Sequence, residues 1–165
     1  GSCLAFFSRY AYLEQVREQF SALHPSIPTR AQNRSMNESD RQGFLDTFTL
    51  LSEGIGFAVL GGAFGEGIDL PGKRLIGAFI ATLGLPQINE VNEEVKARMQ
   101  HMFGAENGYD YAYLYPGIQK VVQAAGRVIR TTEDQGVVYL LDDRFGQSKV
   151  KDLLPAWWKV ESYRL

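Results

Sequence analysis

A chain of 165 residues with 45% hydrophobic residues and a net charge of −2 is ordinarily one domain with its own core. A nearly neutral chain has no general attraction to nucleic acid, so such a role has to depend on local patches. The single cysteine excludes a disulfide framework, an iron–sulfur cluster and a cysteine zinc site within this segment, and it fits a reducing, intracellular setting. No apolar run is long enough to span a membrane, so we expect no membrane partner.

The chain begins with Gly1 and Ser2 and has no initiator methionine. These two residues have the form of a remnant left by tag cleavage. We therefore expect residues 3–165 to be one domain taken from a longer protein.

Short apolar runs alternate with segments of helical periodicity, which is typical of a mainly parallel sheet buried on both faces. The sequence predicts an α/β fold with helices on both faces of that sheet. Strands are expected at residues 3–7, 28–33, 57–61, 75–83 and 137–141. Helices are expected at residues 12–23, 39–51, 89–104, 113–131 and 150–154.

Capping residues mark the ends of two of these helices. Ser39 and Gln42 have the spacing of a capping box, and Gly54 is suited to close the same helix. Asn89 is expected to cap the next helix, which Gly104 closes. The apolar stripe of that second helix consists of Val91, Val95, Met99 and Met102.

The segment QAAGRVIR at residues 123–130 carries the strongest functional signal. Gln123, Arg127 and Arg130 are spaced to share one side of a helix, and no acid lies between Pro116 and Arg130. A solvated helix face usually mixes charges of both signs, although a plain solvent-facing helix remains the alternative. Guanidinium groups and an amide at this spacing suit a terminal phosphate.

The segment GGAFGEGIDLPG at residues 61–72 holds five glycines. Glycine lets the backbone approach a phosphate or a nucleic acid closely, although a tight connection between core strands is the alternative. Ligands in such sheets bind beyond the carboxyl ends of the strands. We expect this segment, residues 142–144 and the arginine helix to line one edge.

Residues 67–73 also fit the GxxxxGK pattern of a P-loop. Arg74 stands where the pattern needs a hydroxyl residue, and Pro71 removes one backbone amide from the phosphate cradle. The next residues predict a strand, whereas a P-loop leads into a helix. These departures count against a self-contained P-loop.

The first predicted strand ends in the segment FFSRY at residues 6–10. Ser8 and Arg9 are suited to contact a phosphate, and Tyr10 is suited to stack on a base. A strand end followed by a helix cap is an equally good reading.

Residues 6–10, 62–72 and 123–130 resemble, in this order, motifs IV, V and VI of superfamily II helicases. The closest resemblance is to the second motor domain of XPD/DinG-like DNA helicases. It implies a RecA-like three-layer sandwich that closes on an N-terminal motor domain of the same polypeptide, with ATP and Mg²⁺ bound mainly by that partner. It also implies movement on single-stranded DNA in the 5′ to 3′ direction during DNA repair.

The resemblance assigns roles to individual residues. Arg130 is the expected arginine finger, Arg127 a second contact to the γ-phosphate, and Gln123 a residue that positions the phosphate or the attacking water. The nucleotide-facing positions are Glu66, Gly67, Asp69 and Gly126. The DNA-facing positions are Ser8, Arg9, Tyr10, Gly62 and Phe64. Arg9 and Gly65 depart from the usual residues of motifs IV and V, which leaves the DNA contacts less defined than the ATP site.

Two alternatives stay open. One is a complete P-loop NTPase that uses Lys73 and Asp142. The other is a non-catalytic α/β module whose basic helix grips a phosphate backbone. For the helicase domain we expect an intracellular location, in a bacterial cytoplasm or otherwise.

Overall fold

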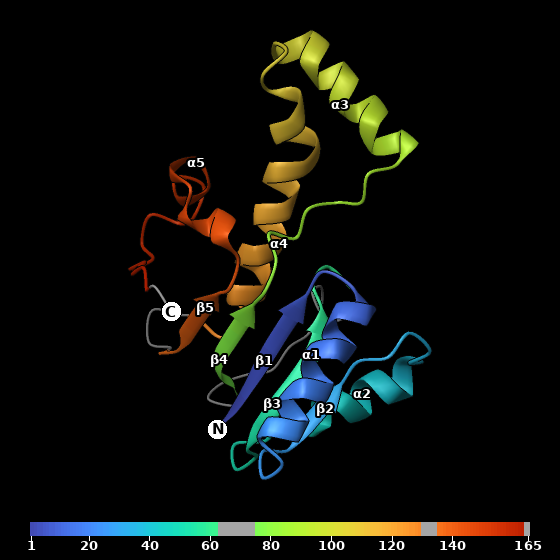
Figure 1. Cartoon of the computed structure of the whole chain (residues 1–165), viewed down its shortest axis with the longest axis vertical. Coiled ribbons are helices and arrows are strands. Elements are labelled where there is room, and N and C mark those ends of the chain that lie inside the picture. Colours follow the sequence, from blue (N-terminus) through green and yellow to red (C-terminus); the bar gives the residue numbers. More distant parts are fainter. Residues whose placement is uncertain (63–74, 130–134, 164–165) are drawn as a thin grey trace.

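The computed structural model describes residues 1–62, 75–129 and 135–163. In these ranges the chain forms a parallel sheet with the strand order β2-β3-β1-β4-β5 (Figure 1). The strands are β1 (Ser2–Phe7), β2 (Thr29–Ala31), β3 (Gly54–Val59), β4 (Leu75–Ile80) and β5 (Val137–Leu140). The helices are α1 (Tyr10–Leu23), α2 (Glu38–Asp46), α3 (Glu90–Phe103), α4 (Tyr115–Ala125) and α5 (Ser148–Lys151). A π-helical turn η1 (Asp110–Leu114) leads into α4, and a 3-10 turn η2 (Asp143–Gly146) precedes α5.

Alternation along the central strand β1 divides the core into two layers. Leu4 and Phe6 are fully buried on the face where α2 and α4 pack. Phe7 points to the opposite face and packs with Leu13 of α1. Because helices cover both faces of a parallel sheet, the predicted three-layer α/β sandwich is confirmed.

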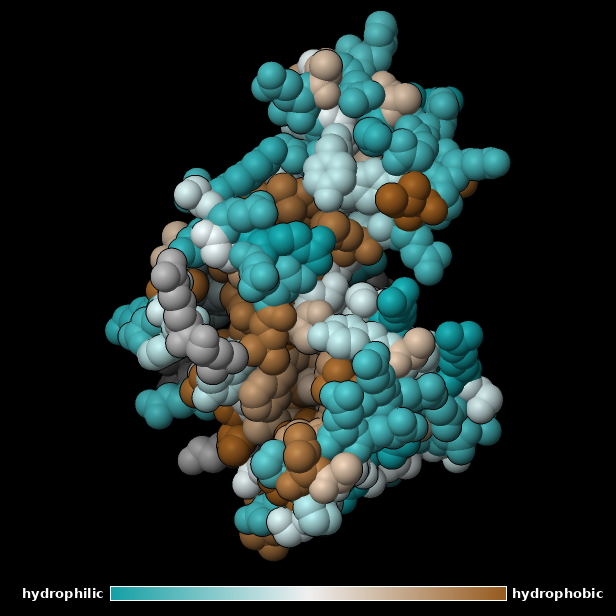
Figure 2. Space-filling view, in the orientation of Figure 1, coloured by the Kyte–Doolittle hydropathy of each residue, from teal (hydrophilic) through white to brown (hydrophobic). Residues whose placement is uncertain are grey.

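Helix α1 covers only part of its face of the sheet. It packs on β3, β1 and β2, and the described residues leave β4 and β5 open beside it. Val137 and Tyr139 of β5 are exposed, and Phe79 of β4 stacks on Tyr139 at 5.0 Å between ring centroids. Figure 2 shows the resulting apolar surface along the sheet next to α1.

Helix α3, η1 and the first part of α4 form an arm that projects beyond the sheet (Figure 1). No residue of α3 is buried, and Val91 and Met102 are 71% and 67% exposed. The predicted apolar stripe of α3 therefore lies outside the buried core. Tyr113 of η1 holds the arm together, since its hydroxyl donates to Glu93 Oε1 at 2.6 Å.

A second contact joins the arm to the end of the chain. The carboxylate of Asp110 is buried in η1, and Lys149 Nζ of α5 lies 2.5 Å from its Oδ2 atom. A carboxylate is rarely buried in proteins unless it is paired, so this ion pair accounts for its place. It also fixes α5 against the base of the arm.

Helix α2 differs from its prediction at both ends. Asn37, and not Ser39, is the N-cap, because Asn37 Oδ1 accepts from the Asp40 amide and Asp40 Oδ2 accepts from the Asn37 amide. The helix ends at Asp46, so Leu51 lies outside it and is exposed. Gly54 opens β3 instead of closing the helix, with φ at +131°.

Two predicted strands also shift. The strand expected at 57–61 is β3, which begins three residues earlier and ends at Val59. The strand expected at 75–83 is β4, which ends at Ile80. The prediction that a strand and not a helix follows the GxxxxGK pattern is confirmed, because β4 begins at Leu75.

Candidate nucleotide and nucleic-acid interface

The carboxyl edge of the sheet holds the residues expected from motif IV. Phe6 and Phe7 are buried in β1, and their carbonyls accept the Ala81 and Leu60 amides at 2.9 Å each. The end of β1 is thereby fixed between its two neighbouring strands. Ser8 and Arg9 follow this end and are exposed, and Tyr10 begins α1 as a half-buried residue.

A lysine of α4 lies over the end of β3. Gly61 has φ at +73°, and a Cβ on it would lie 2.9 Å from Lys120 Cδ. Gly61 is therefore needed for its backbone conformation, and the flexible side chain of Lys120 lies close against it. The Lys120 side chain thus lies where the glycine-rich segment leaves the sheet. Gly62, a predicted DNA contact, follows in a turn, and its amide donates to the Val59 carbonyl.

Small residues bring α4 against the loop that follows β4. A Cβ on Gly117 would lie 2.6 Å from the Leu83 carbonyl oxygen, so only glycine allows this approach. Gly84 has φ at +67°, and its amide donates to the buried hydroxyl of Thr82. The loop after β4 is therefore held rigidly against α4.

The loop after β2 joins the same edge, although no predicted site residue lies in it. Gln32 is buried, and its Oε1 atom accepts the Val59 amide at 2.9 Å. This bond ties the end of β2 to the end of β3. Arg34 follows in the exposed part of the loop, with its guanidinium carbon 5.3 Å from the centre of the Tyr10 ring.

Gln123 and Arg127 do not lie on one continuous helix, which corrects that part of the prediction, while Arg130 lies outside the described residues. Helix α4 ends at Ala125 with Gly126 at its C-cap, so Gln123 lies on the helix and Arg127 in the turn after it. The amides of Arg127 and Val128 donate three residues back, to Ala124 and Ala125, which tightens this last turn. Gln123 is exposed and Arg127 is half-buried.

This turn lies at the amino edge of the sheet, opposite the end of β1. Val128 contacts Gly136, which immediately precedes β5. A crossover between parallel strands has to return to the starting edge, so α4 and the turn after it run from Gly117 at the carboxyl edge to Val128 at the amino edge. Arg127 and residues 142–144 therefore lie at opposite edges, which corrects the expectation that the whole arginine helix lines one edge with them. The first part of α4 does lie at the carboxyl edge, whereas residues 63–72 and Arg130 lie outside the described residues.

Several predicted site residues lie outside the described ranges. These are Phe64, Glu66, Gly67, Asp69 and Arg130, together with the P-loop-like residues Pro71, Lys73 and Arg74. Their roles stay predictions. Gly62 and Leu75 flank residues 63–74. They lie at opposite edges of the sheet because Gly62 follows the end of β3, Leu75 begins β4, and both strands are parallel neighbours of β1.

Asp142 follows β5 at the carboxyl edge, and its carboxylate is hydrogen-bonded to Arg144. Its carboxylate accepts from the Arg144 amide at 3.0 Å, from Nε at 2.8 Å and from Nη2 at 2.6 Å. These hydrogen bonds hold the pKa of Asp142 below its ordinary value. A carboxylate that caps η2 and binds an arginine is poorly suited to hold Mg²⁺, which counts against the complete P-loop NTPase.

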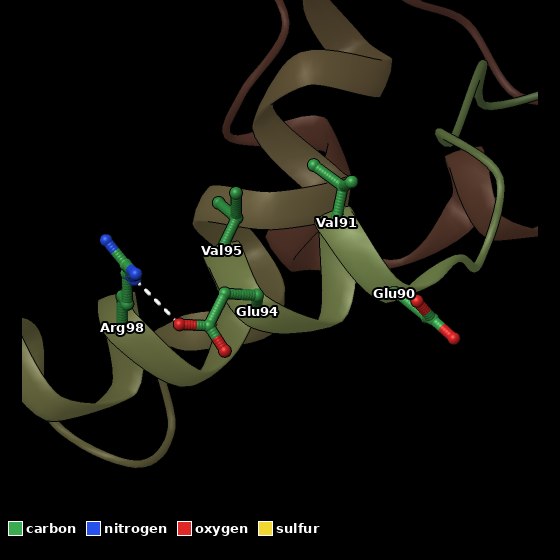
Figure 3. A pocket seen from close by; sticks show the side chains of 5 residues that line it. All are labelled: Glu90, Val91, Glu94, Val95 and Arg98. Carbon is green, nitrogen blue, oxygen red and sulfur yellow. Dashed lines mark hydrogen bonds and ion pairs between the residues drawn. The ribbon is translucent and has the colours of Figure 1, made fainter.

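The exposed side of α3 carries a shallow hollow. Figure 3 shows that its lining comes from α3 alone, with Glu94 bonded to Arg98 at 2.8 Å beside Val91 and Val95. Without polar groups from a second element, this hollow does not have the form of a ligand site.

Among the described residues, no three His, Cys, Asp or Glu side chains gather as they would around a metal ion. Within the same ranges, no helix has the length and apolar character needed to cross a bilayer.

Comparison with known proteins agrees with this architecture. The family described as helicase C-terminal domain matches residues 1–161. The chain is 30% identical over 173 aligned positions to the ATP-dependent DNA helicase CHL1 of Vanderwaltozyma polyspora, which covers 95% of this chain and 21% of that protein. It is 34% identical over 102 positions to the ATP-dependent DNA helicase chl-1 of Caenorhabditis elegans, covering 61% of this chain and 12% of that protein.

Solved structures show the same fold. The structure named XPD_APO superposes with a TM-score of 0.73 at 22% identity, covering 93% of this chain and 30% of that one. The second domain of the DEAD-box helicase Mss116p bound to an RNA duplex has a TM-score of 0.52 at 12% identity, covering 92% of this chain and 46% of that one. The chain thus spans less than half of each of these relatives.

Proposed function

This chain belongs to the helicase C-terminal domain family, and we propose that it is the second motor domain of an ATP-dependent, XPD/DinG-like DNA helicase. In this proposal it completes an ATP site whose phosphate- and Mg²⁺-binding groups belong to an N-terminal motor domain of the same polypeptide. The observation that carries the proposal is the separation of two sets of residues by the sheet. Motif IV lies at its carboxyl edge, and the turn with Arg127 lies at its amino edge.

The residues at the end of α4 fit a nucleotide phosphate. Gln123 presents an exposed amide and Arg127 a guanidinium in the following turn, and both are suited to oxygen-rich anions. In our proposal Arg130 is the arginine finger, which stabilises the charge that develops as the γ-phosphoryl group is transferred. Glu66, Gly67, Asp69 and Gly126 complete the nucleotide side.

The carboxyl edge fits a single strand of DNA. Ser8 offers a hydroxyl, Arg9 a cation and Tyr10 an aromatic ring, which are the groups that bind single strands without reading sequence. In our proposal Gly62 and Phe64 extend this surface. Because α4 passes from this edge to the turn with Arg127, a rigid helix links the two sites, and closure on ATP moves the DNA grip.

The test is an Arg130→Ala substitution in the intact polypeptide that carries this chain. We expect ATP turnover to fall by about a thousandfold or more, which is the size of an arginine-finger effect. Binding of single-stranded DNA should stay unchanged, because Arg130 is assigned to the nucleotide. Arg98→Ala is the matched control, since that exposed arginine pairs with Glu94 on the arm.

Near-normal turnover in the Arg130→Ala protein, with DNA binding intact, would refute the arginine-finger assignment. A polypeptide that hydrolyses ATP but shows no response to single-stranded DNA would refute the helicase assignment itself. The intracellular location and the role in DNA repair are further parts of this proposal.

A further inference from the structure

The loop that carries Arg34 has a backbone held by hydrogen bonds. The Ser35 amide and hydroxyl both donate to Asn33 Oδ1 at 3.0 Å, which closes a tight turn around Arg34. One residue before this turn, the buried Gln32 accepts the Val59 amide and anchors the loop to β3. Because this backbone is already ordered, little backbone entropy is lost when Arg34 binds a ligand.

Arg34 also spans the sheet edge to reach motif IV. Its guanidinium lies over the ring of Tyr10, which follows β1, although Arg34 itself follows β2. Because β3 lies between those two strands, the contact crosses about 10 Å of the edge at the usual spacing of neighbouring strands. The loops after β1 and β2 therefore form one continuous surface.

The chemistry of that surface suits a phosphate backbone. A cation–π contact uses the face of a guanidinium and leaves the N–H donors at its rim available for a bidentate bond. Arg34 forms no hydrogen bond or ion pair with any other residue in the described ranges. Residues 8–13 and 32–37 contain Arg9 and Arg34 but no aspartate or glutamate.

We propose that Arg34, stacked on Tyr10, binds a backbone phosphate of single-stranded DNA that crosses the carboxyl edge from β1 towards β2. Arg9 binds a neighbouring phosphate of the same strand. This inference deepens the proposed function and rests on it, and it assigns a DNA contact outside the three motifs.

The test measures binding of a fluorescent oligothymidylate to the intact polypeptide over a range of salt concentrations. In Arg34→Ala, loss of one charge-assisted phosphate bond should weaken binding by about tenfold. The slope of log K against log salt should become shallower by about 0.7, because one fewer counterion is released. Arg34→Lys should keep the slope of the wild type, while Arg98→Ala should change neither quantity.

An oligonucleotide with abasic sites separates the phosphate from the base. If Arg34 binds a phosphate, its substitution should weaken binding to the abasic strand by the same factor as binding to the normal strand. DNA-stimulated ATP hydrolysis gives an independent readout. Arg34→Ala should raise the DNA concentration for half-maximal stimulation and leave the maximal rate unchanged.

Wild-type affinity and salt slope in Arg34→Ala would overturn this inference and leave the proposed function intact, provided that the wild type binds DNA. Failure of the wild type to bind single strands would refute both. A melting temperature equal to that of the wild type shows that the variant is folded, and Arg34→Gln serves as a second variant if it is not.

Discussion

Replacing Gly61 with alanine tests whether the end of β3 is built around a left-handed residue. Gly61 has φ at +73°, a conformation in which an L-residue costs about 1–2 kcal/mol. The new Cβ would also lie 2.9 Å from Lys120 Cδ and 3.2 Å from Cε. Because both atoms belong to a flexible side chain, Lys120 can move aside at little cost, and the backbone sets the effect.

We therefore expect Gly61→Ala to lower the free energy of unfolding by about 1–2 kcal/mol, or the melting temperature by about 2–8 °C. Gly43→Ala is the matched control, because Gly43 lies within α2 and a Cβ there meets nothing within 4 Å. That substitution should stabilise the chain by about 0.5–1 kcal/mol, since alanine favours a helix more than glycine does.

Urea unfolding followed by circular dichroism measures both variants. Gly61→Asn adds a third point, because asparagine enters the left-handed region more readily than alanine and should lose less stability. If Gly61→Ala is as stable as the wild type while Gly43→Ala gains stability, the left-handed turn at Gly61 is refuted. The expected order of stability is Gly43→Ala, wild type, Gly61→Asn and Gly61→Ala.

Three other substitutions test the arm and the cap of α2. The hydrogen bond to Glu93 raises the pKa of Tyr113 to about 12. The folded state therefore keeps a proton that the unfolded state loses above pH 10, and stability should fall between about pH 10 and 12. In Tyr113→Phe that part of the alkaline loss should vanish, and an unchanged alkaline slope in chemical unfolding would refute the coupling. Asn37→Ala removes the α2 cap and should cost about 1 kcal/mol, whereas Ser39→Ala, at the wrongly predicted cap, should cost less than about 0.5 kcal/mol in urea unfolding. Equal losses in these two variants would contradict the observed cap.

The sheet could be predicted because its signal is local. Apolar runs such as residues 3–7 are too short for helices and lack the alternation of a half-exposed strand, so burial on both faces follows. The cap of α2 was missed because Asn37 with Asp40 and Ser39 with Gln42 both have capping spacing, only two residues apart. Sequence spacing alone does not choose between two overlapping boxes.

The end of α4 shows a second limit of sequence analysis. Val128 and Ile129 continue the apolar period of the helix, so the pattern extends past the point where the helix stops. Gly126 was the available signal, since glycine costs a helix about 1 kcal/mol relative to alanine. Those two apolar residues instead pack beside Gly136 before β5, a tertiary contact that no periodicity reveals.

The arm and Arg34 show a third limit. A stripe such as Val91 to Met102 indicates an apolar helix face but does not identify what covers it. The contact of Arg34 with Tyr10 depends on the order of β2, β3 and β1, which the linear sequence does not state. A polar residue just after a predicted strand is the general signal that would have pointed to Arg34.

In our proposal this chain completes an ATP site and does not contain one. Calorimetric titration of the chain with Mg²⁺ and a non-hydrolysable ATP analogue tests it most directly, first alone and then with the N-terminal motor domain of its polypeptide. We predict little binding by the chain alone, and tight binding that depends on Arg127 and Arg130 when both domains are present. Tight Mg²⁺-dependent binding by the chain alone that is lost in Lys73→Ala would contradict this account and identify a self-contained P-loop.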